Sequence, residues 1–350
     1  MQSGAPGTRH LIFGYSRARK PEIMHIERSP MKVLLLEPIH GDGVKLVREV
    51  AEVVYATGHS EEEIASQAAE VEAIIIRNKG FLTEAVFERA KRLKCVARHG
   101  VGVDNIDVKA ATKRGLPVCF APGANTESVA EHAILLMLAM GKRTAYLDRE
   151  VRKGRWWDLR SLEFFELKGK SLGLIGLGRI GRRVAELALA FGMEVYAHDP
   201  YLRPEEMKSQ GVIPAGQDEI LQSCDIISLH LPLLPESKKY LGAKEFEMMK
   251  KGAVLINTGR GGLVDEKALL DALQSGRLFG AGLDVTDSEP PSPQNPLFRL
   301  ENVVFSPHMA AHSTTSMRNM AVFVAEQVVK VLRGERPTLV VNPEVLEAKS

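Results

Sequence analysis

Residues 171–181 read SLGLIGLGRIG, and this stretch decides the fold. An apolar run ends at Ile175 and passes directly into the glycine pattern of Gly176, Gly178 and Gly181. A strand, a glycine turn and a helix in this order are typical of the first unit of a dinucleotide-binding sheet. Gly176 would permit the tight turn, Gly178 would let a pyrophosphate approach the backbone, and Gly181 would let the helix pack closely on the strand. The alternative is a glycine turn that serves packing alone.

An acidic residue stands where such a sheet would need one. Asp199 ends the next apolar run, about 20 residues after the glycine loop. A carboxylate there would accept hydrogen bonds from the adenosine ribose hydroxyls and repel a 2′-phosphate, so NAD is favoured over NADP. The nearby Arg203 complicates this preference, and a helix cap or turn residue is the alternative reading of Asp199.

Working outward, apolar runs alternate with helical patterns along almost the whole chain. The runs before the glycine loop are 33–36, 73–76, 95–97 and 117–119, and those from the loop onward are 171–175, 194–197, 225–229, 253–256, 279–283 and 302–305. Such alternation predicts an α/β protein with two doubly wound parallel sheets. A long helix is expected over 126–147, and a final helix over 313–332 that stops at Gly334.

Composition bounds the functional class. The chain has 350 residues, 45% of them hydrophobic, and a formal net charge of +2, which predicts two domains and no nucleic-acid partner. Three scattered cysteines give neither a disulfide framework nor a metal-ligand pattern, so we expect a reducing, cytoplasmic location and no metal. The longest apolar run, residues 133–140, is too short to cross a membrane.

The first residues differ from the rest. Nothing acidic precedes Glu22, whereas basic residues recur, a bias compatible with a transit peptide. Residues 1–31 are nevertheless expected to be a disordered extension, because Met31 stands directly before a clean strand pattern and no amphipathic helix stands out.

Three segments after the glycine loop supply groups for oxidising an alcohol. Arg260 lies among glycines just past an apolar strand, where it could hold a carboxylate through two hydrogen bonds; a surface arginine is the alternative. Glu289 lies on a loop stiffened by Pro290 and Pro291. His308 follows another strand and a proline, and it is the best candidate for the acid or base. Its rivals are His312, His99, His132 and His230.

At this point the sequence resembles the D-isomer-specific 2-hydroxyacid dehydrogenases, from about residue 32 to 343. The resemblance is densest in segments 98–105, 122–132, 176–181, 257–265, 281–291 and 306–308. It is greatest to the short form of D-3-phosphoglycerate dehydrogenase and to the hydroxypyruvate and glyoxylate reductases. It implies a flavodoxin-like substrate domain (32–124 with 310–343), a Rossmann NAD-binding domain (125–309) and a cleft between them.

The resemblance also implies roles for individual residues. Arg260 matches the substrate-binding arginine, Glu289 the carboxylate that bonds the catalytic imidazole, and His308 the acid/base. The backbone of Gly100, Val101 and Gly102 matches the loop that binds the substrate carboxylate. The matched cofactor contacts are Gly176, Gly178, Arg179, Ile180, Gly181, Asp199, Leu231, Thr258, Gly259 and Asp284, although a turn residue is the alternative for Asp284.

Several expectations remain open at this stage. Arg77 and Lys79 occupy the region where phosphoglycerate dehydrogenases carry basic residues that face the substrate; a solvated loop is the alternative. His308 is followed by Met-Ala-Ala where many relatives have a glycine. An NAD(H)-sensing corepressor of the C-terminal-binding-protein type is the alternative function, and phosphite oxidation stays possible, whereas Glu289 disfavours a formate dehydrogenase. A homodimer formed through 126–147 is expected, as is the absence of a regulatory domain beyond Ser350.

Overall fold

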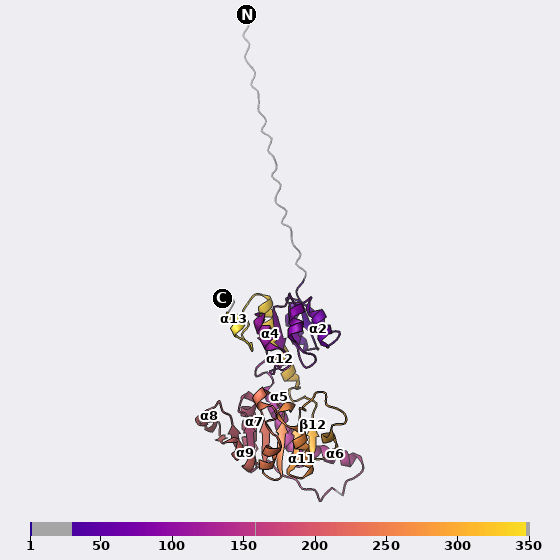
Figure 1. Ribbon diagram of the computed structural model, residues 1–350, viewed down its shortest axis with the longest axis vertical. Helices are drawn as coiled ribbons and strands as arrows, with labels where there is room; N and C mark the ends of the chain where they lie inside the picture. The colour runs from indigo at the N-terminus through magenta and orange to yellow at the C-terminus, as the bar shows by residue number, and fades with distance from the viewer. Residues whose placement is uncertain (2–29, 158, 348–350) are drawn as a thin grey trace. The chain divides into compact units, whose positions relative to one another are not determined.

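The computed structural model describes residue 1, residues 30–157 and residues 159–347 (Figure 1). The described residues from 31 onward form one compact unit. The predicted disorder of residues 1–31, and any targeting role, therefore falls almost entirely outside the described residues.

The first sheet is parallel and five-stranded, with the order β2-β1-β3-β4-β5. This is the flavodoxin-like order of a doubly wound sheet, and the direction of winding reverses between β1 and β3. Its strands are β1 (Lys32–Leu35), β2 (Glu52–Tyr55), β3 (Ala73–Ile76), β4 (Cys95–Arg98) and β5 (Val118–Cys119). The helices between them are α1 (Gly41–Arg48), α2 (Glu61–Ala68), α3 (Glu84–Arg89) and α4 (Val108–Lys113).

The second sheet is parallel and seven-stranded, with the order β12-β11-β10-β9-β6-β7-β8. From β8 to β11 this is the strand order of a dinucleotide-binding sheet, and winding reverses between β6 and β9. Its strands are β6 (Ser171–Ile175), β7 (Glu194–His198), β8 (Ile213–Pro214), β9 (Ile226–Leu229), β10 (Ala253–Asn257), β11 (Leu278–Leu283) and β12 (Val303–Phe305). The connecting helices are α7 (Arg179–Ala190), α8 (Pro204–Lys208), α9 (Gln217–Ser223), α10 (Ala243–Met248) and α11 (Glu266–Gln274), with 3-10 turns at Pro235–Ser237, Gly261–Leu263 and Pro296–Arg299. The predicted fold class is confirmed.

The long connecting helix is shorter than predicted. α5 (Thr126–Lys142) ends where Arg143 adopts a left-handed conformation (φ 51°), and a separate helix α6 (Thr144–Arg152) follows. The prediction of one helix over 126–147 was therefore wrong at its C-terminal end. The predicted apolar face is confirmed: Val129, Ala133, Leu136 and Met140 are buried, and the last three belong to the core of the seven-stranded sheet.

The C-terminal helix α12 (Thr314–Leu332) packs on α1 and β4, so the end of the chain returns to the five-stranded sheet. In Figure 1 this yellow helix lies among the indigo elements of that sheet, and a short α13 (Glu344–Glu347) follows. The helix ends as predicted, with Gly334 at φ +83° just beyond it. The division into domains 32–124 with 310–343 and 125–309 stays a prediction.

Local rules explain several helix starts. Ser60 accepts a hydrogen bond from the backbone of Glu63, whose carboxylate accepts one from the backbone of Ser60, so the predicted capping box is confirmed. Thr83 caps α3 in the predicted way. Among the described helices, none has both the length and the apolar composition that a bilayer span requires.

Candidate functional site

The glycine loop has the geometry that its sequence predicts. Gly176 has φ +94°, and a Cβ there would lie 2.8 Å from the carbonyl oxygen of His230. A Cβ on Gly181 would collide with the carbonyl of Gly176, so this position brings α7 close to β6. Nothing lies within 4 Å of a Cβ built on Gly178, which caps α7 without a side-chain hydrogen bond. The start of α7 thus offers an open backbone and a positive dipole end to an anion.

Asp199 lies directly beyond β7 and is joined to this loop. Its Oδ2 accepts a hydrogen bond from the backbone N–H of Leu177 (2.9 Å), and its Oδ1 accepts one from that of Tyr201 (3.0 Å). A carboxylate can accept about four hydrogen bonds, so each oxygen keeps a lone pair for a diol. A pocket of about 320 Å³ lies beside it, lined by residues that include His198, Asp199 and Pro214.

The other predicted cofactor contacts lie along the same edge of the sheet. The hydroxyl of Thr258 is buried and has no hydrogen-bond partner within the described residues. Asn257 holds the next turn, because its side chain accepts from the N–H of Gly259 (3.0 Å) and donates to the carbonyl of Arg260 (2.9 Å). An open glycine backbone, an uncapped helix and an orphaned hydroxyl together fit a dinucleotide.

His308 meets the predicted carboxylate. Its Nδ1 lies 2.6 Å from Oε2 of Glu289, and the two side chains are 37% and 39% exposed. An ionised carboxylate only accepts hydrogen bonds, so Nδ1 carries a proton in this pair. Nε2 is therefore the nitrogen that can exchange a proton with a ligand.

The loop that carries Glu289 is tethered to α11. Glu266, in the first turn of α11, accepts from the N–H of Asp287 (2.7 Å) and from the side chain of Asn295 (3.0 Å). The backbone N–H of Thr286 also donates to Glu289 (3.4 Å). These contacts keep the carboxylate facing the imidazole.

The rival histidines are less suited to acid–base chemistry. Burial lowers the pKa of both His99 and His230 to about 4, so these rings are neutral near pH 7. Burial and the neighbouring Arg77 also lower the pKa of His312, whose Nε2 contacts the Arg77 guanidinium. His132 bonds the hydroxyl of Ser306 (2.7 Å), and its Nε2 lies 3.7 Å from Oδ1 of Asp284, a carboxylate already hydrogen-bonded to the 308–310 turn. His308 is the one paired in the way that proton transfer requires.

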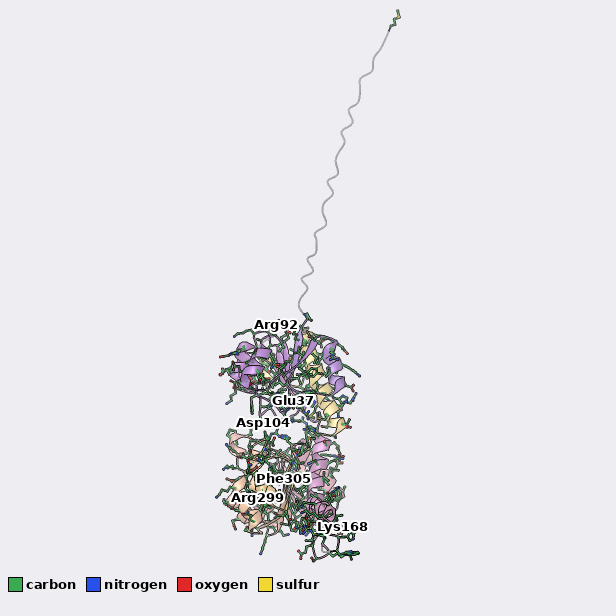
Figure 2. The ribbon with its side chains drawn as sticks, turned by 90° about the vertical axis from the view of Figure 1, so that its right-hand side faces the viewer. Glu37, Arg92, Asp104, Lys168, Arg299 and Phe305 are labelled. Atoms are coloured by element: carbon green, nitrogen blue, oxygen red, sulfur yellow. The ribbon has the colours of Figure 1, made fainter. Side chains whose placement is uncertain are left out.

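Arg260 reaches from the seven-stranded sheet to a loop of the five-stranded one. Its Nε and one terminal nitrogen each lie 2.9 Å from Oδ2 of Asp104, which is labelled in Figure 2. A side chain at Gly102 would collide with this guanidinium. Arg260 thus lies against the predicted carboxylate-binding loop, and Asp104 takes the position of a carboxylate partner.

The loop of Gly100, Val101 and Gly102 is held in shape by an arginine that sequence analysis did not assign to the site. Arg98, the last residue of β4, donates to the carbonyls of Gly102 (2.7 Å) and His99 (3.0 Å). Burial lowers the pKa of Arg98 to about 10, which leaves it cationic at pH 7. Within the described residues, the N–H groups of Val101 and Gly102 have no acceptor and remain available for a ligand.

Arg77 and Lys79 lie on the loop after β3. Their loop is anchored by Glu37, whose carboxylate accepts from the N–H groups of Asn78 (2.5 Å) and Lys79 (2.7 Å). The guanidinium of Arg77 contacts His312, so it faces the segment that also carries His308. The structure therefore brings Arg77 toward the candidate site, whereas the orientation of Lys79 is fixed only through its backbone.

The carboxylate of Asp284 already accepts hydrogen bonds from within the chain. This carboxylate is 1% exposed and accepts from the Ser306 hydroxyl (2.5 Å) and the N–H groups of Met309 (2.8 Å) and Ala310 (2.9 Å). Three bonds leave one lone pair for a cofactor amide. The turn-residue reading and the cofactor reading of Asp284 are thus compatible.

Sequence analysis missed four residues of this region: Arg98, Asp104, His132 as a partner of Ser306, and Glu266. Arg98 and Asp104 lie in the segment 98–105, on either side of the loop 100–102, so their position in the sequence could have indicated them. The others act across long separations in the chain, which a single sequence does not reveal. No group of three His, Cys, Asp or Glu side chains that could hold a metal occurs in the described part of the chain.

Comparison with known proteins identifies the family. Residues 134–310 match the model described as D-isomer specific 2-hydroxyacid dehydrogenase, NAD binding domain. The predicted NAD cofactor is thereby confirmed.

Named relatives agree with this match. The chain is 42% identical over 321 residues to a D-3-phosphoglycerate dehydrogenase of Methanocaldococcus jannaschii, covering 91% of this chain and 61% of that protein. It is 40% identical over 293 residues to a glyoxylate reductase of Korarchaeum cryptofilum, covering 83% of this chain and 88% of that one. The chain thus spans about six tenths of the first relative's length and most of the second's.

A solved structure gives the same result. A glyoxylate reductase from Paecilomyes thermophila superimposes with a TM-score of 0.82 at 30% identity, covering 91% of this chain and all of that one. These relatives carry enzyme names, which favours the enzyme over the corepressor alternative. This chain belongs to the family of D-isomer specific 2-hydroxyacid dehydrogenases.

Proposed function

We propose that this protein is an NAD-dependent oxidoreductase that transfers a hydride between nicotinamide and a D-2-hydroxy acid or its 2-keto acid. The observation that carries the proposal is the His308–Glu289 pair at 2.6 Å, with Arg260 on a neighbouring loop at the same edge of the sheet as the glycine loop. Ligands of open α/β sheets bind at that edge.

Each residue of the proposed site has a chemical task. Arg260 holds the substrate carboxylate, which takes the place of Asp104, and the N–H groups of Val101 and Gly102 hold it from the other side. In the direction of reduction, Nε2 of His308 gives its proton to the carbonyl oxygen. Glu289 stabilises the imidazolium before transfer and keeps its orientation afterwards.

The cofactor supplies the hydride that adds to the carbonyl carbon. The start of α7 and the glycine loop would hold its pyrophosphate, Asp199 its adenosine ribose, and Thr258 and Asp284 the nicotinamide end. Arg179, Ile180, Leu231 and Gly259 lie on the same loops and complete the proposed contacts. Because Asp199 would repel a 2′-phosphate, we propose NAD rather than NADP.

The substrate is a small acid. The named relatives point to two choices: 3-phosphoglycerate with 3-phosphohydroxypyruvate, or glyoxylate with the related hydroxypyruvate. A phosphorylated substrate would give the cationic Arg77 and Lys79 a function, since Arg77 faces the segment of His308.

The test is NADH oxidation by the purified chain with 3-phosphohydroxypyruvate, hydroxypyruvate, glyoxylate, pyruvate and an aryl pyruvate. Each substrate is run again with NADPH. We expect turnover with at least one small 2-keto acid and a clear preference for NADH. No NADH oxidation with any of them would contradict the proposal, and equal specificity constants for NADH and NADPH would contradict the role of Asp199.

We also propose that the protein is a homodimer. On α5, eight of 17 residues are buried within the chain and Leu135 is the large apolar side chain left exposed, so we extend the surface predicted for 126–147 to the rest of α6 and the segment after it. Exposed apolar side chains there are Val151, Trp156, Trp157 and Phe164. Light scattering should give twice the 38.5 kDa of one chain, and replacing Trp156 and Trp157 with Glu should give the monomer mass. Replacing Phe81, an exposed aromatic residue on the loop between β3 and α3, with Ser is the control and should leave the mass unchanged.

Two further predictions concern the whole chain. We propose a cytoplasmic location, supported by three cysteines that are buried and whose scattered spacing offers no disulfide framework. Imaging fusions with and without residues 1–30 tests it, and an organellar signal that depends on those residues would contradict it.

We also propose that 32–124 with 310–343 closes on 125–309 to exclude water, which solution scattering with and without NADH would test.

A further inference from the structure

The turn that presents His308 has an unusual backbone. His308 has φ +53°, in the left-handed region that residues other than glycine seldom adopt. Its N–H donates to the carbonyl of Asp284 (2.7 Å), and the next two N–H groups, of Met309 and Ala310, donate to the Asp284 carboxylate. The conformation of the acid/base residue therefore depends on where Asp284 is held.

Asp284 is in turn held by a side chain that faces α5. The Ser306 hydroxyl lies 2.5 Å from Oδ1 of Asp284 and 2.7 Å from Nε2 of His132. An ionised carboxylate has no proton to give, so the single Ser306 hydrogen goes to Asp284. His132 must then donate its Nε2–H to Ser306, which fixes its tautomer.

The same helix reaches the turn at a second point. Ser128 precedes His132 by one helical turn on α5, and its hydroxyl donates to the carbonyl of Ala310 (2.7 Å). Ser128 also accepts from the N–H of Ser313, at the start of α12. α5 thus contacts both sides of the 308–310 turn, and its own apolar face is fixed in the core.

We infer that His132 is a positioning residue of the proposed dehydrogenase. It donates to Ser306, Ser306 donates to Asp284, and Asp284 holds the turn in which His308 faces Glu289. His132 touches neither the reacting atoms nor Glu289 in this arrangement, so it acts through the turn alone. The kinetic test of this inference rests on the proposed function. A second test, by amide hydrogen exchange, rests only on the hydrogen bonds of the turn.

The kinetic test compares His132→Phe, His132→Gln, Ser306→Ala and the double variant His132→Phe/Ser306→Ala. Reduction is followed with NADH and the 2-keto acid that the wild type uses best. Phe fills the ring volume without a donor, whereas the Gln amide can donate from the position of Nε2. We expect kcat to fall about 10-fold to 100-fold in His132→Phe, because small misplacements of an acid/base residue are costly. KM and the NADH dissociation constant should change less than about twofold, since ground-state binding is retained.

Two comparisons separate positioning from a general loss of structure. His132→Gln should recover most of the lost kcat, and the double variant should be no slower than the slower single variant, because both changes break one chain of contacts. Glu131→Gln, at an exposed position of the same helix, is the matched control and should match wild type. Additive losses, or a Gln variant as slow as the Phe variant, would overturn the inference.

The second test does not depend on activity. Amide hydrogen exchange of the peptide 305–311 in the full chain should be faster in His132→Phe than in wild type and near wild type in His132→Gln. A peptide within α12, such as 318–330, serves as the internal standard. If wild type turns over no keto acid, the proposed function fails while this test still applies. Unchanged exchange of 305–311 in His132→Phe overturns the positioning role even in an active enzyme.

Discussion

The two sheets contribute to the candidate site in different ways. The seven-stranded sheet carries side chains that are fixed by carboxylates: Glu289 holds His308, Asp284 holds the following turn, and Asp199 holds the glycine loop. The five-stranded sheet carries the loop 100–102, in which the N–H groups of Val101 and Gly102 have no acceptor among the described residues, and two arginines, Arg98 and Arg77, near it. The seven-stranded side holds the acid–base groups at fixed hydrogen-bonding distances. The five-stranded side supplies the positive charge and the N–H donors that an acidic substrate needs.

This difference indicates which residues of the site can be replaced without loss of the reaction. Proton transfer needs its groups within hydrogen-bonding distance, and the hydrogen bonds of the seven-stranded side enforce that. Recognition of an acidic substrate needs positive charge and open donors, for which several arrangements serve. Substitutions on the first side should therefore reduce turnover of every substrate, whereas those on the second should change the ranking of substrates.

The largest expected effect is that of removing His308. We expect His308→Ala to lower kcat about 1000-fold for every 2-keto acid, because a positioned acid contributes about 10²–10⁴-fold. Glu289→Gln keeps an acceptor for Nδ1 but removes the charge, so kcat should fall less, about 10-fold to 100-fold. NADH binding, measured by its fluorescence, should be retained in both.

The control for this prediction lies four residues further along the chain. His312 contacts Arg77 on the five-stranded side, so His312→Asn should affect substrates unequally and cost less turnover than His308→Ala. A His308→Ala variant within about threefold of wild type would show that the seven-stranded side does not supply the acid.

Most strands and helices of the two sheets could be predicted from the sequence, because they depend on the local pattern of apolar residues. β6 and β9, the central pair of the seven-stranded sheet, are almost completely buried, since both faces of a parallel sheet are covered. β2 and β8 were missed: β2 is an edge strand with partly exposed residues, and β8 has only two residues. The end of α5 was also missed, because Arg143 adopts a positive φ without a glycine to signal it.

The site was predictable only where its members were adjacent in the chain or carried a family motif. The glycine loop, Arg260 and His308 stand at strand ends, and strand ends converge at one edge of a parallel sheet. The contact of Arg260 with Asp104 and that of His132 with Ser306 join residues more than a hundred positions apart. Such contacts depend on packing, which one sequence does not reveal.

The second prediction concerns Arg77. We expect Arg77→Met to lower kcat/KM for 3-phosphohydroxypyruvate about 10-fold to 100-fold, because a hydrogen bond to a charged group contributes roughly 1.5–3 kcal/mol. The same change should lower kcat/KM for glyoxylate less than about threefold, since glyoxylate has no phosphate. Lys79→Met removes the other cation of the same loop and should lower kcat/KM for the phosphorylated acid less than Arg77→Met does, because only the backbone of Lys79 is held in place. Equal losses for both substrates would mean that Arg77 supports the common reaction and that the contrast between the two sheets is wrong.

The smallest expected effect compares a buried histidine from each sheet. Burial lowers the pKa of His99, on the five-stranded side, and of His230, on the seven-stranded side, from 6.5 to about 4. The unfolded chain binds a proton at each below pH 6.5, whereas the folded chain does not until about pH 4. Each histidine thus destabilises the fold as the pH falls through this window and has no such effect above it.

Urea unfolding at pH 7.5 and pH 5 measures this loss. His99→Gln and His230→Gln cannot titrate, so each should reduce the pH-dependent loss of unfolding free energy by about 2 kcal/mol relative to wild type. Arg77 adds to the low pKa of His99 but is not among the causes for His230. Arg77→Met should therefore reduce the acid sensitivity that depends on His99 by a few tenths of a kcal/mol and leave that of His230 unchanged. An equal change at both histidines would show that the arginine acts on the stability of the whole chain and not locally on the five-stranded side.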